Sequence, residues 1–87
     1  MVQRRQVGMT VFELVAVDLS ELSTPEIFRS LHSQLGRAQK AAWLHYTRTC
    51  YPIRDSGKIG WLKKGQRTWT SGALLWVMYN IREITVK

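Results

Sequence analysis

Residues 9–17, MTVFELVAV, form an almost uninterrupted apolar run that is rich in β-branched and aromatic side chains. Such residues favour a β-strand, in which successive side chains point to opposite faces of the sheet. Both alternating sets are apolar: Val11, Val15 and Val17 make one, and Phe12, Leu14 and Ala16 make the other. The run therefore predicts a central strand that is covered on both faces. Glu13 is the exception, and it needs a partner or an exposed end.

A helix-start signal follows in residues 22–27, LSTPEI. Ser23 is placed as an N-cap, Glu26 completes a capping box three residues later, and Pro25 falls in the first turn, where its missing N–H costs nothing. Apolar residues then recur at helical spacing, at Ile27, Phe28, Leu31 and Leu35. Gly36 suits the left-handed position that ends a helix. We therefore predict a helix from Ser23 or Thr24 to Leu35.

Residues 43–51, WLHYTRTCY, nearly all favour strands, and Pro52 stops the run. We favour a strand here, because Gly36 and the Thr-Arg-Thr-Cys-Tyr run both argue against one long helix. The competing interpretation continues the first helix through four residues that suit it, Ala38, Ala41, Ala42 and His45. Residues 52–58, PIRDSGK, predict a turn.

Residues 58–72, KIGWLKKGQRTWTSG, predict a β-hairpin with a solvated tip. A three-residue loop at 64–66 would set Trp61 opposite Trp69, so that both rings share one face. A loop of two or four residues would set Leu62 opposite Arg67 and send the tryptophans to opposite faces. We favour the even loop slightly, because the middle of a three-residue loop is not the preferred place for glycine.

The remaining residues predict a second helix and a last strand. Residues 71–81 place Leu74, Val77, Met78 and Ile81 on one helical stripe, although a buried strand is a close alternative for so short a run. Residues 81–87, IREITVK, alternate as a terminal strand does. We therefore expect one domain over residues 1–87, of α+β class. It is a small antiparallel sheet with two helices on one face, in the ferredoxin-like βαββαβ order.

Two segments resemble parts of an RNA recognition motif. Residues 18–44, DLSELSTPEIFRSLHSQLGRAQKAAWL, resemble its first half, and residues 55–62, DSGKIGWL, resemble its third strand. The resemblance supports the ferredoxin-like topology. Val15 and Ile59 stand where that family carries aromatic stacking residues, which leaves Trp61 as the one match.

Charge is distributed unevenly along the chain, whose formal net charge is +7. Four acids and no base lie between Val11 and Glu26, whereas residues 27–82 carry ten bases and one acid, Asp55. A basic surface attracts phosphate backbones, and it also attracts acidic proteins.

The sequence contains no recognisable catalytic, cofactor or metal signature. The soft ligands are His32, His45 and Cys50, and their spacing matches no metal motif. A single cysteine forms no internal disulfide and favours a reducing compartment. The longest apolar stretch, residues 73–79, is too short for a membrane helix, and residues 1–10 lack the apolar part of a signal peptide. We therefore expect a cytoplasmic protein, with a nuclear one not excluded, that is neither secreted nor membrane-bound and has no cofactor.

Interleaved cations and aromatic rings give the leading functional hypothesis, because bases stack on rings while cations hold phosphates. We expect binding of nucleic acid, single-stranded or RNA, by the residues Arg54, Lys58, Trp61, Lys63, Lys64, Arg67 and Trp69. The alternative is a protein-binding inhibitor or accessory subunit that docks its basic face on an acidic partner. A metal-independent ribonuclease is the enzymatic interpretation that we keep, with the candidates His45, Tyr46, Arg48 and Tyr51. Exposed sheet edges also make a homodimer conceivable.

Overall fold

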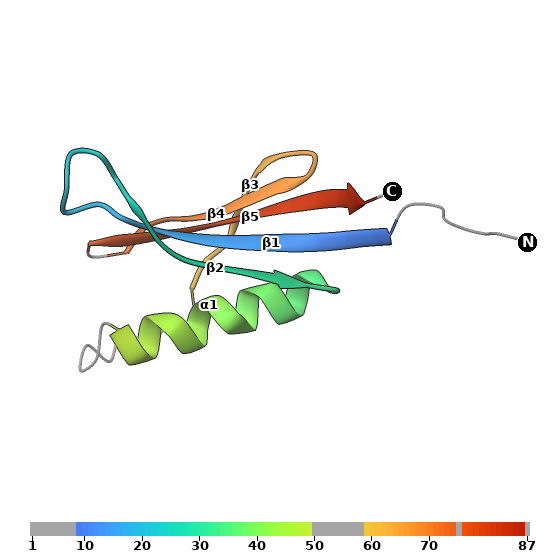
Figure 1. The fold of residues 1–87 in the computed structure, drawn as a ribbon, viewed down its shortest axis with the longest axis horizontal. Coiled ribbons are helices and arrows are strands. Elements are labelled where there is room, and N and C mark those ends of the chain that lie inside the picture. The colour runs from blue at the N-terminus through green and yellow to red at the C-terminus, as the bar shows by residue number, and fades with distance from the viewer. Residues whose placement is uncertain (1–8, 50–58, 75, 87) are drawn as a thin grey trace, which may run out of the picture.

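The computed structural model describes residues 9–49, 59–74 and 76–86 (Figure 1). These ranges contain five strands and one helix, in the order β1 (Met9–Asp18), β2 (Glu26–His32), α1 (Leu35–Thr49), β3 (Leu62–Gly65), β4 (Thr68–Leu74) and β5 (Val77–Val86). The strands make one antiparallel sheet in the spatial order β2-β1-β5-β4-β3.

The centre of the sheet is the long ladder between β1 and β5, which runs from the pair Met9 and Val86 to the pair Asp18 and Val77. The prediction of a central strand over residues 9–17 is therefore confirmed, but the predicted cover on both of its faces is not found, because among the described residues α1 packs on one face alone. The sheet and α1 lie as two layers, with α1 along one side of the strands (Figure 1). In the described residues α1 contacts β1, β2 and β5 but neither β3 nor β4. The β3–β4 end of the sheet extends past the helix.

The core lies between α1 and the sheet face that it covers. Its buried members are Leu14, Ala16, Val77, Tyr79 and Ile81 from the sheet, Ala38, Ala42 and Tyr46 from α1, and Ile59 from the segment before β3. The small alanine side chains let the helix approach the sheet closely. Full burial of one Leu or Ile side chain stabilises the fold by about 1.5–3 kcal/mol.

The predicted βαββαβ order with two helices is wrong, and its first error is the helix from Ser23 or Thr24 to Leu35. Residues 26–32 form β2 instead. Glu26 is the first residue of this strand and caps no helix; its two carboxylate oxygens accept hydrogen bonds from Arg29, at 2.9 and 2.6 Å. Thr24 has a φ of 44° and its amide donates to the Glu21 carbonyl in a turn at 3.0 Å. Pairing with β1 thus outweighs the local capping signal.

The predicted strand over residues 43–51 is also wrong within the described residues, because α1 runs to Thr49. The competing interpretation placed Ala38, Ala41, Ala42 and His45 in a helix, which is what the structure contains. That helix begins at Leu35, after β2, and does not continue an earlier one. Cys50, Tyr51 and the turn predicted for residues 52–58 lie outside the described residues.

The predicted second helix at residues 71–81 is wrong, and the alternative, a buried strand, is closer to the structure. β4 ends at Leu74 and β5 begins at Val77. In β5 the buried residues Val77, Tyr79 and Ile81 alternate with more exposed neighbours, which is the period of a strand. Residues 81–86 belong to β5, as the predicted terminal strand requires.

Candidate functional site

The sheet has two different faces, and the pairing register assigns each strand residue to one of them. Leu14, Ala16, Tyr79 and Ile81 point toward α1 and are buried. The alternating residues point away from α1, and we call their side the open face. It carries Val11, Glu13, Val15 and Val17 of β1, Arg29 and Leu31 of β2, and Met78, Asn80, Arg82 and Ile84 of β5.

The predicted hairpin is confirmed, but neither predicted register is found. Lys63 pairs with Trp69, and the turn lies at Gln66 and Arg67. The ladder shifts between Lys63 and Gly65, so a bulge moves the turn beyond the expected loop. Trp69 is also the partner of the buried Ile81 in β5. Paired residues share a face, so Trp69 points to the side of the sheet that α1 covers.

Trp61 lies on that same side. It lines a hollow of about 270 Å³ with Gln39, Lys40 and Trp43 of α1 and with Ile59. The segment 59–61 that carries it rises from the level of α1 to β3 (Figure 1). Trp61 is partly buried against the core, yet its hollow opens to solvent, so one part of the ring is anchored and another is accessible.

Trp69 is held in a similar way at the end of the sheet that α1 does not contact. The centroid of its ring is 6.0 Å from that of Phe12 and 5.6 Å from the Lys63 Nζ. Such a separation allows a cation–π attraction. We call Lys40, Trp43, Trp61, Lys63 and Trp69 together the aromatic surface.

The helix adds positive charge to this side. α1 carries Arg37, Lys40 and Arg48 and no acidic residue, and all three bases are exposed. No acid within α1 is therefore available to neutralise these cations.

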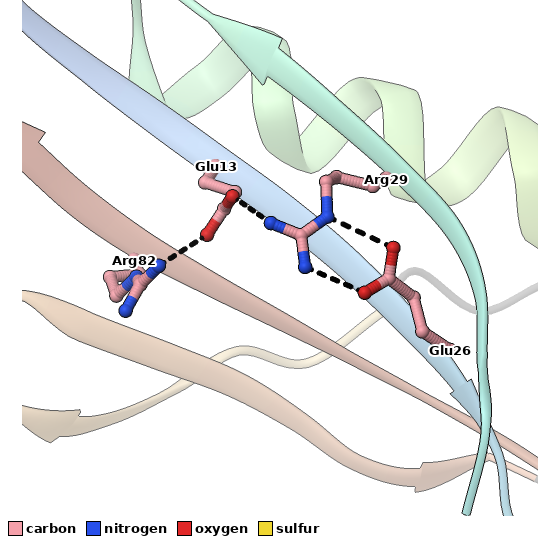
Figure 2. Close-up of polar contacts among 4 residues, drawn as sticks. All are labelled: Glu13, Glu26, Arg29 and Arg82. Atoms are coloured by element: carbon pink, nitrogen blue, oxygen red, sulfur yellow. Dashed lines mark hydrogen bonds and ion pairs between the residues drawn. The ribbon is translucent and has the colours of Figure 1, made fainter.

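The open face instead carries a network of ion pairs (Figure 2). The side chain of Glu13 is only 10% exposed, and it accepts hydrogen bonds from Arg29 on β2 and from Arg82 on β5, the latter at 2.8 Å. Arg29 also binds Glu26, as described above, and these bonds hold the pKa of the Glu26 carboxyl below its usual range. The hydrogen bonds from Arg29 to Glu26 and the negative charges of Glu13 and Glu26 raise the pKa of Arg29. Glu13 therefore has the partners that its place in an apolar strand requires.

The expected binding residues are only partly brought together. Trp61, Lys63 and Trp69 are on the α1 side, but Lys64 borders a hollow on the open face. Arg67 lies in the turn, where its carbonyl accepts a hydrogen bond from the Glu83 amide at 2.9 Å. Arg54 and Lys58 are outside the described residues.

Sequence analysis missed two members of the aromatic surface, Lys40 and Trp43. Neither is among the binding residues that the sequence predicts. In a helix these residues are three apart and lie on one face, so recognition of α1 would have found them. Arg29 and Arg82 were missed too, although Glu13 signalled the need for such a partner.

His45 occupies a mainly structural place in the same layer. Its Nδ1 lies 2.7 Å from the Tyr79 hydroxyl, and its ring stacks on Phe28 with centroids 4.5 Å apart. Burial lowers the pKa of His45. Of the other ribonuclease candidates, Tyr46 is buried with its ring against Trp43 and Tyr79, Arg48 lies in the last turn of α1, and Tyr51 is outside the described residues. The described ranges hold no group of three or more His, Cys, Asp or Glu placed to bind a metal.

Comparison with known proteins finds no matching family model, no matching curated protein and no matching solved structure. No helix in residues 9–49, 59–74 and 76–86 has the length and hydropathy of a membrane span.

Proposed function

We propose that this chain binds single-stranded nucleic acid through the aromatic surface. The observation that carries the proposal is that Trp61 and Trp69 lie on one side of the sheet, each beside a lysine. Lys40 shares the hollow of Trp61, and Lys63 lies over Trp69. A stacked base contributes about 1–3 kcal/mol, while nearby cations hold the backbone phosphates.

Single strands suit this surface better than duplexes. The ring of Trp61 lies in a hollow between α1 and the segment 59–61, where a splayed base reaches it and a base inside a duplex does not. Gln39 in the same hollow offers both a hydrogen-bond donor and an acceptor to the edge of such a base. The exposed bases of α1 extend the cationic field for the rest of the strand.

The open face supports this role much less. In the described residues its strands β1 and β5 carry aliphatic and charged side chains but no aromatic one pointing outward. Two of its arginines are already engaged by carboxylates. The proposal therefore concerns the α1 side, and it drops Lys64 from the expected binding residues.

Fluorescence polarisation with labelled 12-nucleotide single strands and matching duplexes, at 50 and 200 mM salt, tests the proposal. Each phosphate contact to a single strand contributes about 0.7 to the slope of log K against log salt. Lys40→Gln combined with Lys63→Gln is expected to lower that slope by roughly 1.4. A charge-matched control, Arg82→Gln combined with Lys64→Gln on the open face, is expected to change it little.

Stacking is tested separately with Trp61→Leu and Trp61→Phe. Loss of a stacking ring is expected to weaken single-strand binding by about 1–3 kcal/mol, which is about 5-fold to more than 100-fold in Kd, and phenylalanine is expected to restore part of it. Circular dichroism on each variant confirms that the domain is folded. Absence of single-strand binding at 50 mM salt, or equal losses in the two charge-matched pairs of variants, contradicts the proposal.

A further inference from the structure

The open face contains a second hollow, of about 430 Å³, which shares only Trp69 with the aromatic surface. Val15 and Met78 of the two central strands form its apolar part, while Glu13, Arg29, Arg82 and Lys64 bring charge to it. Asn80 and Thr68 add neutral polar groups. The nucleic-acid proposal leaves all of these residues unused.

Three cations and one carboxylate line this hollow, so its lining has an excess of positive charge. Arg29 is heavily engaged, because its Nε, Nη1 and Nη2 each donate a hydrogen bond to Glu26 or Glu13. Arg82 differs, because its side chain is 62% exposed and its contact with Glu13 uses Nη2. For Lys64 no ion pair is found within the described residues. Arg82 and Lys64 are therefore available to an incoming anion.

Exposed apolar side chains lie on the same face as these charges. Leu31 on β2 and Leu62 on β3, near the two edges of the sheet, are 61% and 65% exposed. The solvated face of an antiparallel sheet normally carries polar residues, whereas four of the five outward residues of β1 are apolar: one methionine and three valines. The fitting occupant thus carries both carboxylates and aliphatic side chains.

We propose that the hollow binds an acidic segment of a partner protein, in which carboxylates alternate with aliphatic residues. The carboxylates pair with Arg82 and Lys64, and the aliphatic side chains cover Val15 and Met78. A second copy of this chain fits less well, because two hollows with the same excess of positive charge would repel each other. A nucleic acid also fits less well. Trp69 borders the hollow, but its ring packs against Phe12 on the α1 side.

Fluorescence polarisation of the full chain with a labelled 12-residue peptide of alternating glutamate and leucine tests this inference. Two further peptides separate the contributions: glutamate alternating with serine lacks the apolar part, and lysine alternating with leucine reverses the charge. Both are expected to bind at least tenfold more weakly. Arg82→Gln combined with Lys64→Gln is expected to raise the Kd for the glutamate–leucine peptide roughly tenfold, because hydrogen bonds to charged groups are the strong ones.

The matched control also removes two positive charges, but from α1: it is Arg37→Gln combined with Arg48→Gln. This variant is expected to leave peptide binding unchanged. Thermal melts monitor folding, and single-strand binding measured on the same samples keeps the two proposals apart. Peptide binding that is absent, that is insensitive to Arg82 and Lys64, or that falls equally in the control overturns the inference. So does a loss of oligonucleotide binding, without loss of peptide binding, in the Arg82 and Lys64 variant.

Discussion

Replacement of Glu13 by glutamine tests the ion-pair network at the centre of the sheet. Glutamine has nearly the same shape, so the substitution opens no cavity. Its amide oxygen still accepts a hydrogen bond from one arginine, but its NH₂ group then faces the donors of the other. The change therefore removes one charge-assisted bond and weakens the second.

The size of the effect follows from distance and exposure. At the 2.8 Å between Arg82 and Glu13, two unit charges attract by about 1.5 kcal/mol in water and by about 6 kcal/mol at an effective dielectric constant of 20. The arginine side chains are 49% and 62% exposed, which favours the lower end of this range. Part of this attraction is offset by the conformational entropy that the side chains lose when they are ordered. Each ion pair then contributes about 1 kcal/mol to the free energy of unfolding. We therefore expect Glu13→Gln to lower the free energy of unfolding by about 2 kcal/mol.

Urea denaturation at pH 7 measures this loss, and thermal melts should show a fall in Tm of roughly 8–16 °C. Glu83→Gln is the matched control on β5, because no ion pair involving Glu83 is found in the described residues; it should change stability by less than about 0.5 kcal/mol. A double-mutant cycle of Glu13→Gln with Arg82→Gln should give a coupling energy of about 1 kcal/mol. A loss below about 0.5 kcal/mol for Glu13→Gln would refute the reasoning, because it would mean that water replaces both arginines at no cost.

Four further substitutions test the packing of α1 on the sheet and the backbone around the hairpin. Burial lowers the pKa of His45 in the folded state, so as pH falls the imidazole becomes protonated first in the unfolded state. The free energy of unfolding should therefore decrease as pH drops below about 6.5. In urea denaturation between pH 7 and pH 5, His45→Gln should flatten this dependence. Tyr79→Phe removes the hydroxyl that lies 2.7 Å from His45 Nδ1 and should cost about 1 kcal/mol, again measured in urea. Gly72→Ala should cost about 1–2 kcal/mol in the same assay, because the φ of Gly72 is 70°, whereas Gly60→Ala, where an added Cβ meets nothing within 4 Å, should be close to neutral.

The fold was predictable where one pattern had no rival. Residues 9–17 are apolar on both alternating sets, and they form the central strand. The hairpin was also recognised from its turn residues and flanking strand formers. In both segments the residues that favour a strand locally are also the residues that pair and pack in the sheet, so local preference and tertiary pairing agree.

The helix prediction failed at residues 23–35 because a capping box reports local preference alone. Glu26 and Arg29 have a stronger alternative across β1 and β2, where Arg29 reaches both Glu26 and Glu13. The strand prediction at residues 43–51 failed for the opposite reason. The prediction gave more weight to the aromatic and β-branched residues of this segment than to the alanines at 38, 41 and 42. Two of these alanines are fully buried where α1 meets the sheet. In both segments the deciding interaction lies outside the window that propensity describes.

The candidate site was recovered in part for a related reason. Trp61, Lys63 and Trp69 lie within one predicted hairpin, so the sequence brings them near one another, although the face to which each ring points depends on the register. Lys40 and Trp43 approach them only because α1 lies beside the segment 59–61, which no local pattern reveals. Lys63 and Lys64 are consecutive in β3, and successive strand residues point to opposite faces, so Lys64 borders the hollow of the open face while Lys63 lies beside Trp69.

The fold also redistributes the charge that the sequence separates. Glu13 and Glu26, from the acidic first third of the chain, pair with Arg29 and Arg82 on the open face. The negative charges of these two acids are thereby neutralised on one face of the sheet. The bases of α1 and Lys63 stay on the other side, and no carboxylate is found paired with them among the described residues. Among the described residues, cations without a paired carboxylate therefore lie on the side of the tryptophans, where we propose that a single strand binds, while the open face keeps the smaller excess of positive charge to which we assign the acidic segment.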